Sequence, residues 1–157
     1  MVRFVKQRDR FRCGPVAILN ALKFFGKKCD YSYLYRISDD CHCWGVGGTG
    51  TKVSKFDKSL RKLGRKYFRV RRTYNYSFDK IDEALRKNKL VIIDYVWTDE
   101  KKMLRGHYTA LVRDKFYNYY TVNNYKGKTI YPFHMDAFRA KGQRSNNIKG
   151  MWILSKI

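Results

Sequence analysis

The segment Gln7-Arg8-Asp9-Arg10-Phe11-Arg12-Cys13-Gly14-Pro15 runs directly into an apolar stretch with the spacing of a helix. Apolar residues recur there at steps of three and four, at Ala17, Ile18, Ala21, Leu22 and Phe25. This spacing predicts a core helix over residues 15–25 that Gly26 ends, with Cys13 at its start. Pro15 suits the first turn, because the N–H that proline lacks has no helical partner there. The sequence therefore predicts a thiol at the N-terminus of a buried helix.

The composition indicates one folded domain. The chain has 157 residues, which is enough for a single core and too few for two comfortable ones. Hydrophobic residues make up 44% and aromatic residues 17%, which excludes a disordered chain although 31% of residues are charged. Residues 1–11 lack the apolar region of a signal peptide, and no apolar run is long enough to span a bilayer. We expect one domain over residues 1–157, in the cytoplasm, with reduced cysteines.

Two further helices and a group of strands follow. Apolar residues at steps of three, four and three predict a helix that ends at Gly64: Val53, Phe56, Leu60 and Leu63. A third helix is expected from Asp79 to about Asn88, with Ser77 near its N-cap. Strands are expected over residues 90–97, 108–113, 117–122 and 151–157, which are rich in β-branched and aromatic residues. The predicted fold class is α+β, with a helical part over about 1–88 and a mostly antiparallel sheet over about 89–157.

A thiol needs help to act as a nucleophile. The ordinary pKa of cysteine is about 8.5, and a helix N-terminus with a neighbouring imidazolium can lower it to about 3.5–7.5. Among the histidines, His42 lies between cysteines and His134 lies in an expected loop. His107 instead begins a strand, over residues 107–112, that is otherwise suited to the core. We therefore expect His107 to be the partner of Cys13.

A catalytic histidine needs a third group that fixes its ring orientation and tautomer. If residues 108–113 and 117–122 form a hairpin whose turn is centred on Lys115, Asn123 lies opposite His107 and points to the same face. Asn124 would then face away. A change of one residue in the turn would exchange the two asparagines, so Asn124 stays as the alternative third residue.

Gln7 can supply an amide for an acyl-transfer site. The tetrahedral intermediate of such a reaction needs N–H donors at its oxyanion, and the Gln7 side chain and the Cys13 main chain can provide two. Loss of one such donor typically costs about 2.7–4 kcal/mol of transition-state stabilisation. The order of Gln7, Cys13, His107 and Asn123 therefore predicts a Cys-His-Asn triad with an oxyanion hole.

These residues resemble the pattern of the papain-like cysteine peptidase superfamily. Within it they are similar to the free-standing relatives of the peptidases that remove double-glycine leaders from bacteriocin precursors. The interval of six residues from Gln7 to Cys13 and of sixteen from His107 to Asn123 both agree with that superfamily. The resemblance also includes the loop and helix over 48–64, the helix and strand over 81–97, and the last hydrophobic strand with Trp152.

The resemblance implies a papain-like fold, with N-terminal helices packed on the sheet, and a cysteine peptidase that needs no cofactor. By it Gln7 is the oxyanion residue, Cys13 the nucleophile, His107 the general base and acid, and Asn123 the orienting residue. The implied substrate is an extended peptide or an isopeptide. The glycine-rich loop would border the cleft, so the residues expected to contact substrate are Gly47, Gly48, Thr49 and Gly106.

The sequence departs from the leader peptidases in two respects. They usually have Asp where this chain has Asn123, and they are commonly fused to a membrane transporter, so a role in bacteriocin export is not implied. A thiol amidase, deamidase or transferase would share the acyl-enzyme step and stays an alternative. A catalytically silent binding module on the same fold is another.

The positive charge points to an acidic partner. Lysine and arginine number 35 against 13 acids, so the formal net charge is +22. From Lys52 to Arg72 there are ten basic residues and one acid. The expected helix presents four of them on one face, with four aromatic residues nearby: Lys55, Lys58, Lys62 and Arg65, then Tyr67, Phe68, Tyr74 and Tyr76. Nucleic acid, an anionic membrane surface, an acidic protein or another polyanion would each satisfy this charge, and so would a basic face that is simply solvated. Nucleic acid would also use the aromatic residues, since cations hold phosphates and aromatic rings stack on bases.

Two other motifs are weaker. Residues 45–50 match Gly-x-Gly-x-x-Gly, but no buried strand leads into them, so no dinucleotide site is expected. Three cysteines and a histidine have the residue types of a zinc site: Cys29, Cys41, His42 and Cys43. Adjacent ligands in Cys-His-Cys do not match the usual spacing, so we expect structural thiols and no metal.

Overall fold

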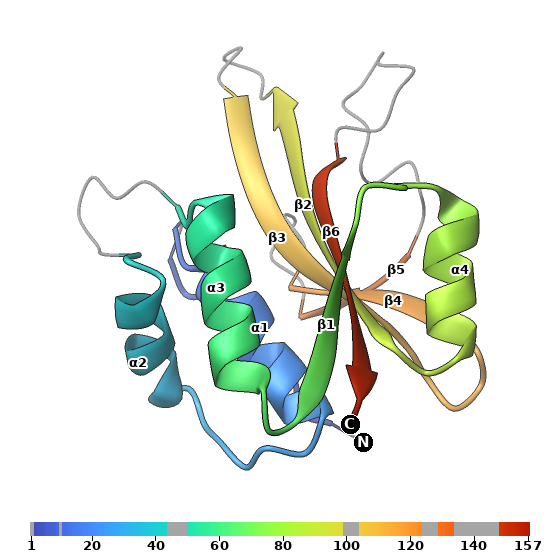
Figure 1. Ribbon diagram of the computed structural model, residues 1–157, viewed down its shortest axis with the longest axis horizontal. Coiled ribbons are helices and arrows are strands. Elements are labelled where there is room, and N and C mark those ends of the chain that lie inside the picture. The colour runs from blue at the N-terminus through green and yellow to red at the C-terminus, as the bar shows by residue number, and fades with distance from the viewer. Residues whose placement is uncertain (1, 10, 44–49, 99–103, 124–128, 134–147) are drawn as a thin grey trace.

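A six-stranded antiparallel sheet carries helices on both of its faces (Figure 1). The computed structural model describes residues 2–9, 11–43, 50–98, 104–123, 129–133 and 148–157. The elements in chain order are α1 Cys13–Phe24, α2 Tyr33–Asp40, α3 Val53–Gly64, β1 Phe68–Thr73, α4 Phe78–Arg86, β2 Leu90–Thr98, β3 Leu104–Arg113, β4 Tyr119–Val122, β5 Ile130–Pro132 and β6 Ile148–Lys156. The strand order is β1-β6-β2-β3-β4-β5, and every described pair is antiparallel. The predicted α+β class is confirmed.

The two faces of the sheet have separate cores. Helices α1, α2 and α3 cover one face, where Tyr108 and Trp152 pack among their apolar side chains. Helix α4 covers the opposite face and packs on Val91, Ile93 and Met151. The expectation of N-terminal helices on one sheet is therefore confirmed for the first three helices, and α4 adds a third layer.

The predicted helices begin and end close to the expected residues. Helix α4 starts after Ser77, whose hydroxyl accepts a hydrogen bond from the main-chain N–H of Lys80 at 3.3 Å. Helix α3 ends at Gly64, where a Cβ would lie 2.1 Å from the buried ring of Phe68. Only glycine leaves room for that ring. In the described part of the chain, no helix is both long enough and apolar enough to span a bilayer.

Two elements correct the expected division into a helical part and a sheet part. Strand β1 lies within residues 1–88, because Phe68-Arg-Val-Arg-Arg-Thr alternates apolar and basic residues and pairs with β6. The alternation was hidden by the run of basic residues around it. Helix α2 was also not predicted. Its sequence is mostly polar, and its buried residues, which include Leu34 and Ile37, are too few to give a clear apolar pattern.

A buried asparagine fixes the N-terminal segment beside α1. Asn20 lies in the middle of α1, where its side chain is fully buried. Its Oδ1 accepts a hydrogen bond from the Val5 N–H, and its Nδ2 donates one to the Val5 carbonyl, both at 2.9 Å. The segment that leads to Gln7 is therefore held by two hydrogen bonds from one amide.

Replacing Asn20 should loosen this segment. The Asn20→Ala variant leaves the N–H and C=O of Val5 without their partner, and we expect a loss of about 2–4 kcal/mol in the free energy of unfolding. Asn118→Ala is the matched control, because that amide hydrogen-bonds Asp114 on the exposed turn and its loss should cost under about 1 kcal/mol. Urea unfolding of both variants measures the difference. Equal losses in the two variants would contradict the role of Asn20 in holding this segment.

Candidate active site

The thiol of Cys13 lies where the first turn of α1 meets the middle of β3. Cys13 is the first residue of α1 and is 6% exposed. The main-chain N–H groups of Tyr108 and Gly14 lie close enough to its sulfur to favour the thiolate. Tyr108 directly follows His107 in β3, so the main chain beside the thiol leads to the predicted histidine. A Cβ on Gly14 would lie 2.8 Å from the Thr51 hydroxyl, so glycine permits this close packing.

Burial keeps the thiol protonated in the resting site. It raises the pKa of Cys13 to about 11, although the N–H groups of Tyr108 and Gly14 act in the opposite direction. The negative charge of Asp94 raises that pKa further. The sequence predicted an activated thiolate from the helix N-terminus, and in the structure the cost of desolvation outweighs that effect.

The imidazole of His107 is buried and oriented by the main chain of residue 123. Its Nε2 lies 2.5 Å from the carbonyl oxygen of Asn123. A carbonyl can only accept, so Nε2 carries the proton and Nδ1 has the lone pair. The ring of Tyr95 meets the imidazole edge-on, with the ring centroids 5.7 Å apart. Burial lowers the pKa of His107 to about 4, so the ring is neutral at pH 7.

The side chain of Asn123 pairs with Gln7. Its Oδ1 accepts a hydrogen bond from the Gln7 main-chain N–H, and its Nδ2 donates one to the Gln7 Oε1, both at 2.9 Å. Asn123 therefore contacts two of the predicted residues, His107 through its carbonyl and Gln7 through its amide. Its φ of 57° lies in the left-handed region, which asparagine tolerates better than most residues.

The centre of the β3–β4 turn differs from the prediction by one residue, which shifts the strand register by two. Thr109 and not His107 therefore lies opposite Asn123, and Asn123 keeps its predicted face. The pairing of Ala110 with Val122 centres the turn on Phe116, and not on Lys115. A loop of three residues forms because Asp114 Oδ1 accepts hydrogen bonds from the N–H groups of Phe116 and Asn118. Tyr117 completes this turn in the left-handed region, at φ 64°.

The amide of Gln7 has a fixed orientation. Because Asn123 donates to Oε1, the other end of the amide is Nε2, which donates to the Asp9 carbonyl at 2.7 Å. An amide nitrogen carries two hydrogens, so one stays for an oxyanion. Asp9 also holds the loop before α1, since its Oδ1 accepts from the N–H groups of Phe11 and Arg12.

The remaining predicted residues divide into two groups. Gly47, Gly48, Thr49 and the alternative Asn124 lie outside the described residues, as does His134. Gly106 is exposed on β3, where a Cβ would have its nearest neighbour at 3.8 Å. Its backbone is therefore open beside His107.

The cysteines and His42 form no metal cluster within the part of the chain that the structure describes. All four cysteines are free, and the Cys43 thiol donates to the Phe11 carbonyl at 3.0 Å.

Sequence reasoning missed two residues of the site. Asp94 lies opposite Tyr108 in the β2–β3 pair, and burial raises its pKa to about 6 although Arg72 and Lys149 lower it. The signal was an acid within the apolar run of β2. Tyr108 stacks on Phe56 with ring centroids 4.3 Å apart, and its hydroxyl donates to the Thr51 carbonyl at 3.0 Å. The Tyr108 side chain therefore holds the segment that begins α3 beside the site.

The fold resembles that of a solved structure described as a C39-like peptidase. No protein-family model matches the sequence, and no curated protein matches it either. A candidate C39-like peptidase from Bacillus anthracis has a similar structure, with a TM-score of 0.60 and 10% sequence identity, over 99% of this chain and 95% of that one. The cysteine protease interpain A from Prevotella intermedia gives a TM-score of 0.47 and 12% identity, over 79% and 54%. The similarity to the C39-like structure confirms the predicted fold.

Burial of His107 should make stability depend on pH. Its pKa is about 4 in the folded state and about 6.5 unfolded, so unfolding takes up a proton between these values. Between pH 7 and pH 5, the free energy of unfolding of the wild-type protein should therefore fall by about 2 kcal/mol more than that of a His107→Gln variant. Urea unfolding of both proteins at pH 7, 6 and 5 measures this difference. Parallel pH profiles would contradict the buried neutral imidazole.

Proposed function

We propose that this chain is a cysteine peptidase that cleaves an extended peptide. The observation that carries the proposal is one connected set of contacts between segments far apart in sequence. Cys13 touches the residue after His107, His107 bonds the Asn123 carbonyl, and the Asn123 amide bonds Gln7. The similarity in fold to a candidate C39-like peptidase supports the same reading.

The resting pair is neutral, so the reaction begins as general-base catalysis. As the Cys13 sulfur bonds to the carbonyl carbon, its proton passes to Nδ1 of His107. The Asn123 carbonyl stabilises the imidazolium, because it accepts the Nε2 proton. Attack and proton transfer occur together, since burial disfavours a free thiolate at this position.

The oxyanion of the tetrahedral intermediate has two donors in the proposal. One is the main-chain N–H of Cys13, because the first N–H groups of a helix have no intrahelical acceptor. The other is the Nε2 of Gln7. When the intermediate collapses, His107 returns the proton to the leaving amine, and water then hydrolyses the acyl-enzyme by the same route in reverse.

The open part of β3 suits an extended peptide. Strand β4 pairs with residues 110–113 of β3, so the part of β3 that carries Gly106 and His107 extends beyond it. Gly106 offers an exposed backbone next to His107. An extended substrate could form main-chain hydrogen bonds there, as in β-strand addition. The glycine at 106 is consistent with close approach by a substrate backbone.

Cleavage of a peptide library tests the proposal. Wild-type protein should cut members of a proteome-derived library, as detected by mass spectrometry of new termini, and Cys13→Ala should lower the rate by at least about a thousandfold. Cys29→Ala is the matched control, since that thiol hydrogen-bonds the Lys27 carbonyl away from the site, and it should retain the wild-type rate. An uncut library, or cutting that survives Cys13→Ala, would overturn the proposal.

The role of the Asn123 side chain can be separated from that of its carbonyl. Asn123→Gly removes the amide and keeps both the carbonyl and the left-handed backbone. If the amide acts by orienting Gln7, this variant and Gln7→Ala should each lower kcat by about 100–1000-fold, with little change in KM. The double variant should then be no slower than either single variant. Additive losses would indicate that the Asn123 amide acts on another group.

A further inference from the structure

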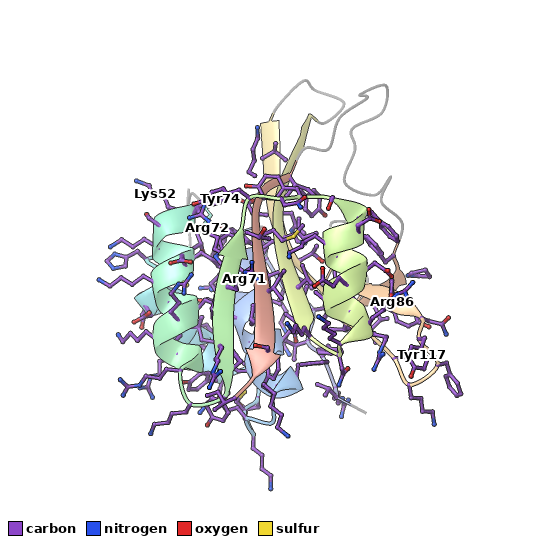
Figure 2. The ribbon with its side chains drawn as sticks, turned by 45° about the vertical axis from the view of Figure 1, so that its right-hand side comes forward. Lys52, Arg71, Arg72, Tyr74, Arg86 and Tyr117 are labelled. Carbon is purple, nitrogen blue, oxygen red and sulfur yellow. The ribbon has the colours of Figure 1, made fainter. Side chains whose placement is uncertain are left out.

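The peptidase proposal leaves the positive charge of α3 and β1 unexplained. Helix α3 lies beside β1, and Arg61 joins the two by donating to the Val70 carbonyl at 3.1 Å (Figures 1 and 2). We call the basic residues of these two elements, with the residues that flank them, the α3–β1 surface. It consists of Lys52, Lys55, Lys58, Arg65, Lys66, Arg69, Arg71, Arg72 and Tyr74. Side chains alternate along the edge strand β1, so Arg72 lies on the face of the sheet that α3 covers, and Arg69 and Arg71 point to the opposite face.

Apart from Arg72, whose charge lowers the pKa of the Asp94 carboxyl, the cations of the α3–β1 surface have no acidic partner among the described residues. Two other cations of α3 are paired, Arg61 with Asp57 at 3.0 Å and Lys62 with Asp40 at 2.8 Å. Within the described ranges, the lysines and arginines of the surface itself have no acidic group within 4 Å. Lys62, which the sequence placed in this group, is therefore the exception. The repulsion between the remaining cations favours binding of an anion.

An exposed aromatic ring lies at the end of this surface. Tyr74 is 72% exposed, and the guanidinium of Arg72 lies 5.1 Å from its ring centroid. The other neighbour of Arg72 is the buried ring of Trp152, at 5.4 Å. Figure 2 shows Arg72 and Tyr74 together, near Lys52. The Nε of Arg72 is buried and has no hydrogen-bond partner among the described residues. Arg72 is thus held beneath a ring that faces solvent.

Of the four aromatic residues that the sequence suggested for stacking on bases, the structure leaves one available. Phe68 is buried in the core, and Tyr67 is half-buried against Lys27. Tyr76 donates its hydroxyl proton to the Lys149 carbonyl at 3.2 Å. Of the four aromatic side chains considered, Tyr74 alone offers a free face for stacking.

A membrane or an acidic protein fits these features less well. The apolar side of α3 is buried, with Phe56 and Leu60 fully covered, so the helix has no apolar face to insert into a bilayer. An acidic protein would use the cations but has no need of an exposed ring beside them. Single-stranded nucleic acid uses both, since phosphates meet the cations and a base stacks on the ring.

We propose that the α3–β1 surface binds single-stranded nucleic acid, with the phosphates along α3 and β1 and a base stacked on Tyr74. The binding does not depend on the catalytic residues. Cys13→Ala should therefore bind as tightly as wild type, and failure of the peptidase proposal would leave this one standing.

Fluorescence anisotropy with a labelled oligothymidylate tests the surface. The triple variant Lys58→Gln, Arg65→Gln and Arg71→Gln removes three cations. It should weaken binding at least tenfold at 0.1 M salt and lower the slope of log K against log salt by about 2. The matched control is Arg86→Gln, Lys87→Gln and Lys115→Gln, which changes the net charge equally. Those residues lie near the C-terminal end of α4, where Arg113 donates to the Arg86 carbonyl at 2.9 Å. The control should bind nearly as wild type.

Tyr74 distinguishes nucleic acid from other polyanions. Tyr74→Ala should weaken oligothymidylate binding by about 5–100-fold, whereas Tyr74→Phe keeps the ring and should retain most of the affinity. Both triple variants and both Tyr74 variants change exposed side chains, so their urea midpoints of unfolding should equal that of wild type. Equal effects of the two triple variants, indifference to Tyr74→Ala, or tighter binding to polyglutamate or phosphatidylserine vesicles would overturn the proposal.

Discussion

The pairing of the Asn123 and Gln7 amides is the interaction on which the candidate site depends. It joins residues 116 positions apart and brings the segment before α1 to the end of β4. Without it, neither the orientation of the Gln7 amide nor the approach of that segment to β3 would be set. One asparagine thereby fixes the Gln7 amide with its side chain and the His107 imidazole with its carbonyl. The Asn20 amide likewise hydrogen-bonds the N–H and C=O of Val5, so two buried amides hold the N-terminal segment in place.

Burial decides the protonation states at the site. The same desolvation that raises the pKa of Cys13 lowers that of His107, because each is a penalty on the charged form. The helix N-terminus and two N–H groups favour a thiolate, and they do not offset the loss of water. In the proposed reaction, a neutral pair places the proton transfer in the transition state, where the substrate carbonyl and the proposed oxyanion donors share the developing charge. Orientation of His107 then matters more than its basicity.

Much of the fold could be predicted from the sequence, because the signals were local. The spacing of apolar residues gave α1, α3 and α4 close to their observed bounds, and the β-branched runs gave the main strands. Strand β1 was missed since its alternation is short and its polar positions are all basic. The register at Asn123 depended on where one turn closes, and Asp114 moved that turn by accepting two main-chain N–H groups. Which atoms of Asn123 meet His107 follows from this turn and from a left-handed backbone, and residue spacing contains neither.

The positive charge and the site share one helix without sharing residues. Thr51, which precedes α3, packs on Gly14 and accepts the Tyr108 hydroxyl, so the start of α3 belongs to the site. The outward side of the same helix carries Lys55 and Lys58, which form no ion pair with any of the described residues. Because apolar contacts such as Phe56 on Tyr108 hold α3 in place, the helix tolerates repulsion on its outer side. Because its buried side holds α3 in place, the residue types on its exposed side can vary without loss of the fold. A strongly basic surface can therefore coexist with a peptidase fold.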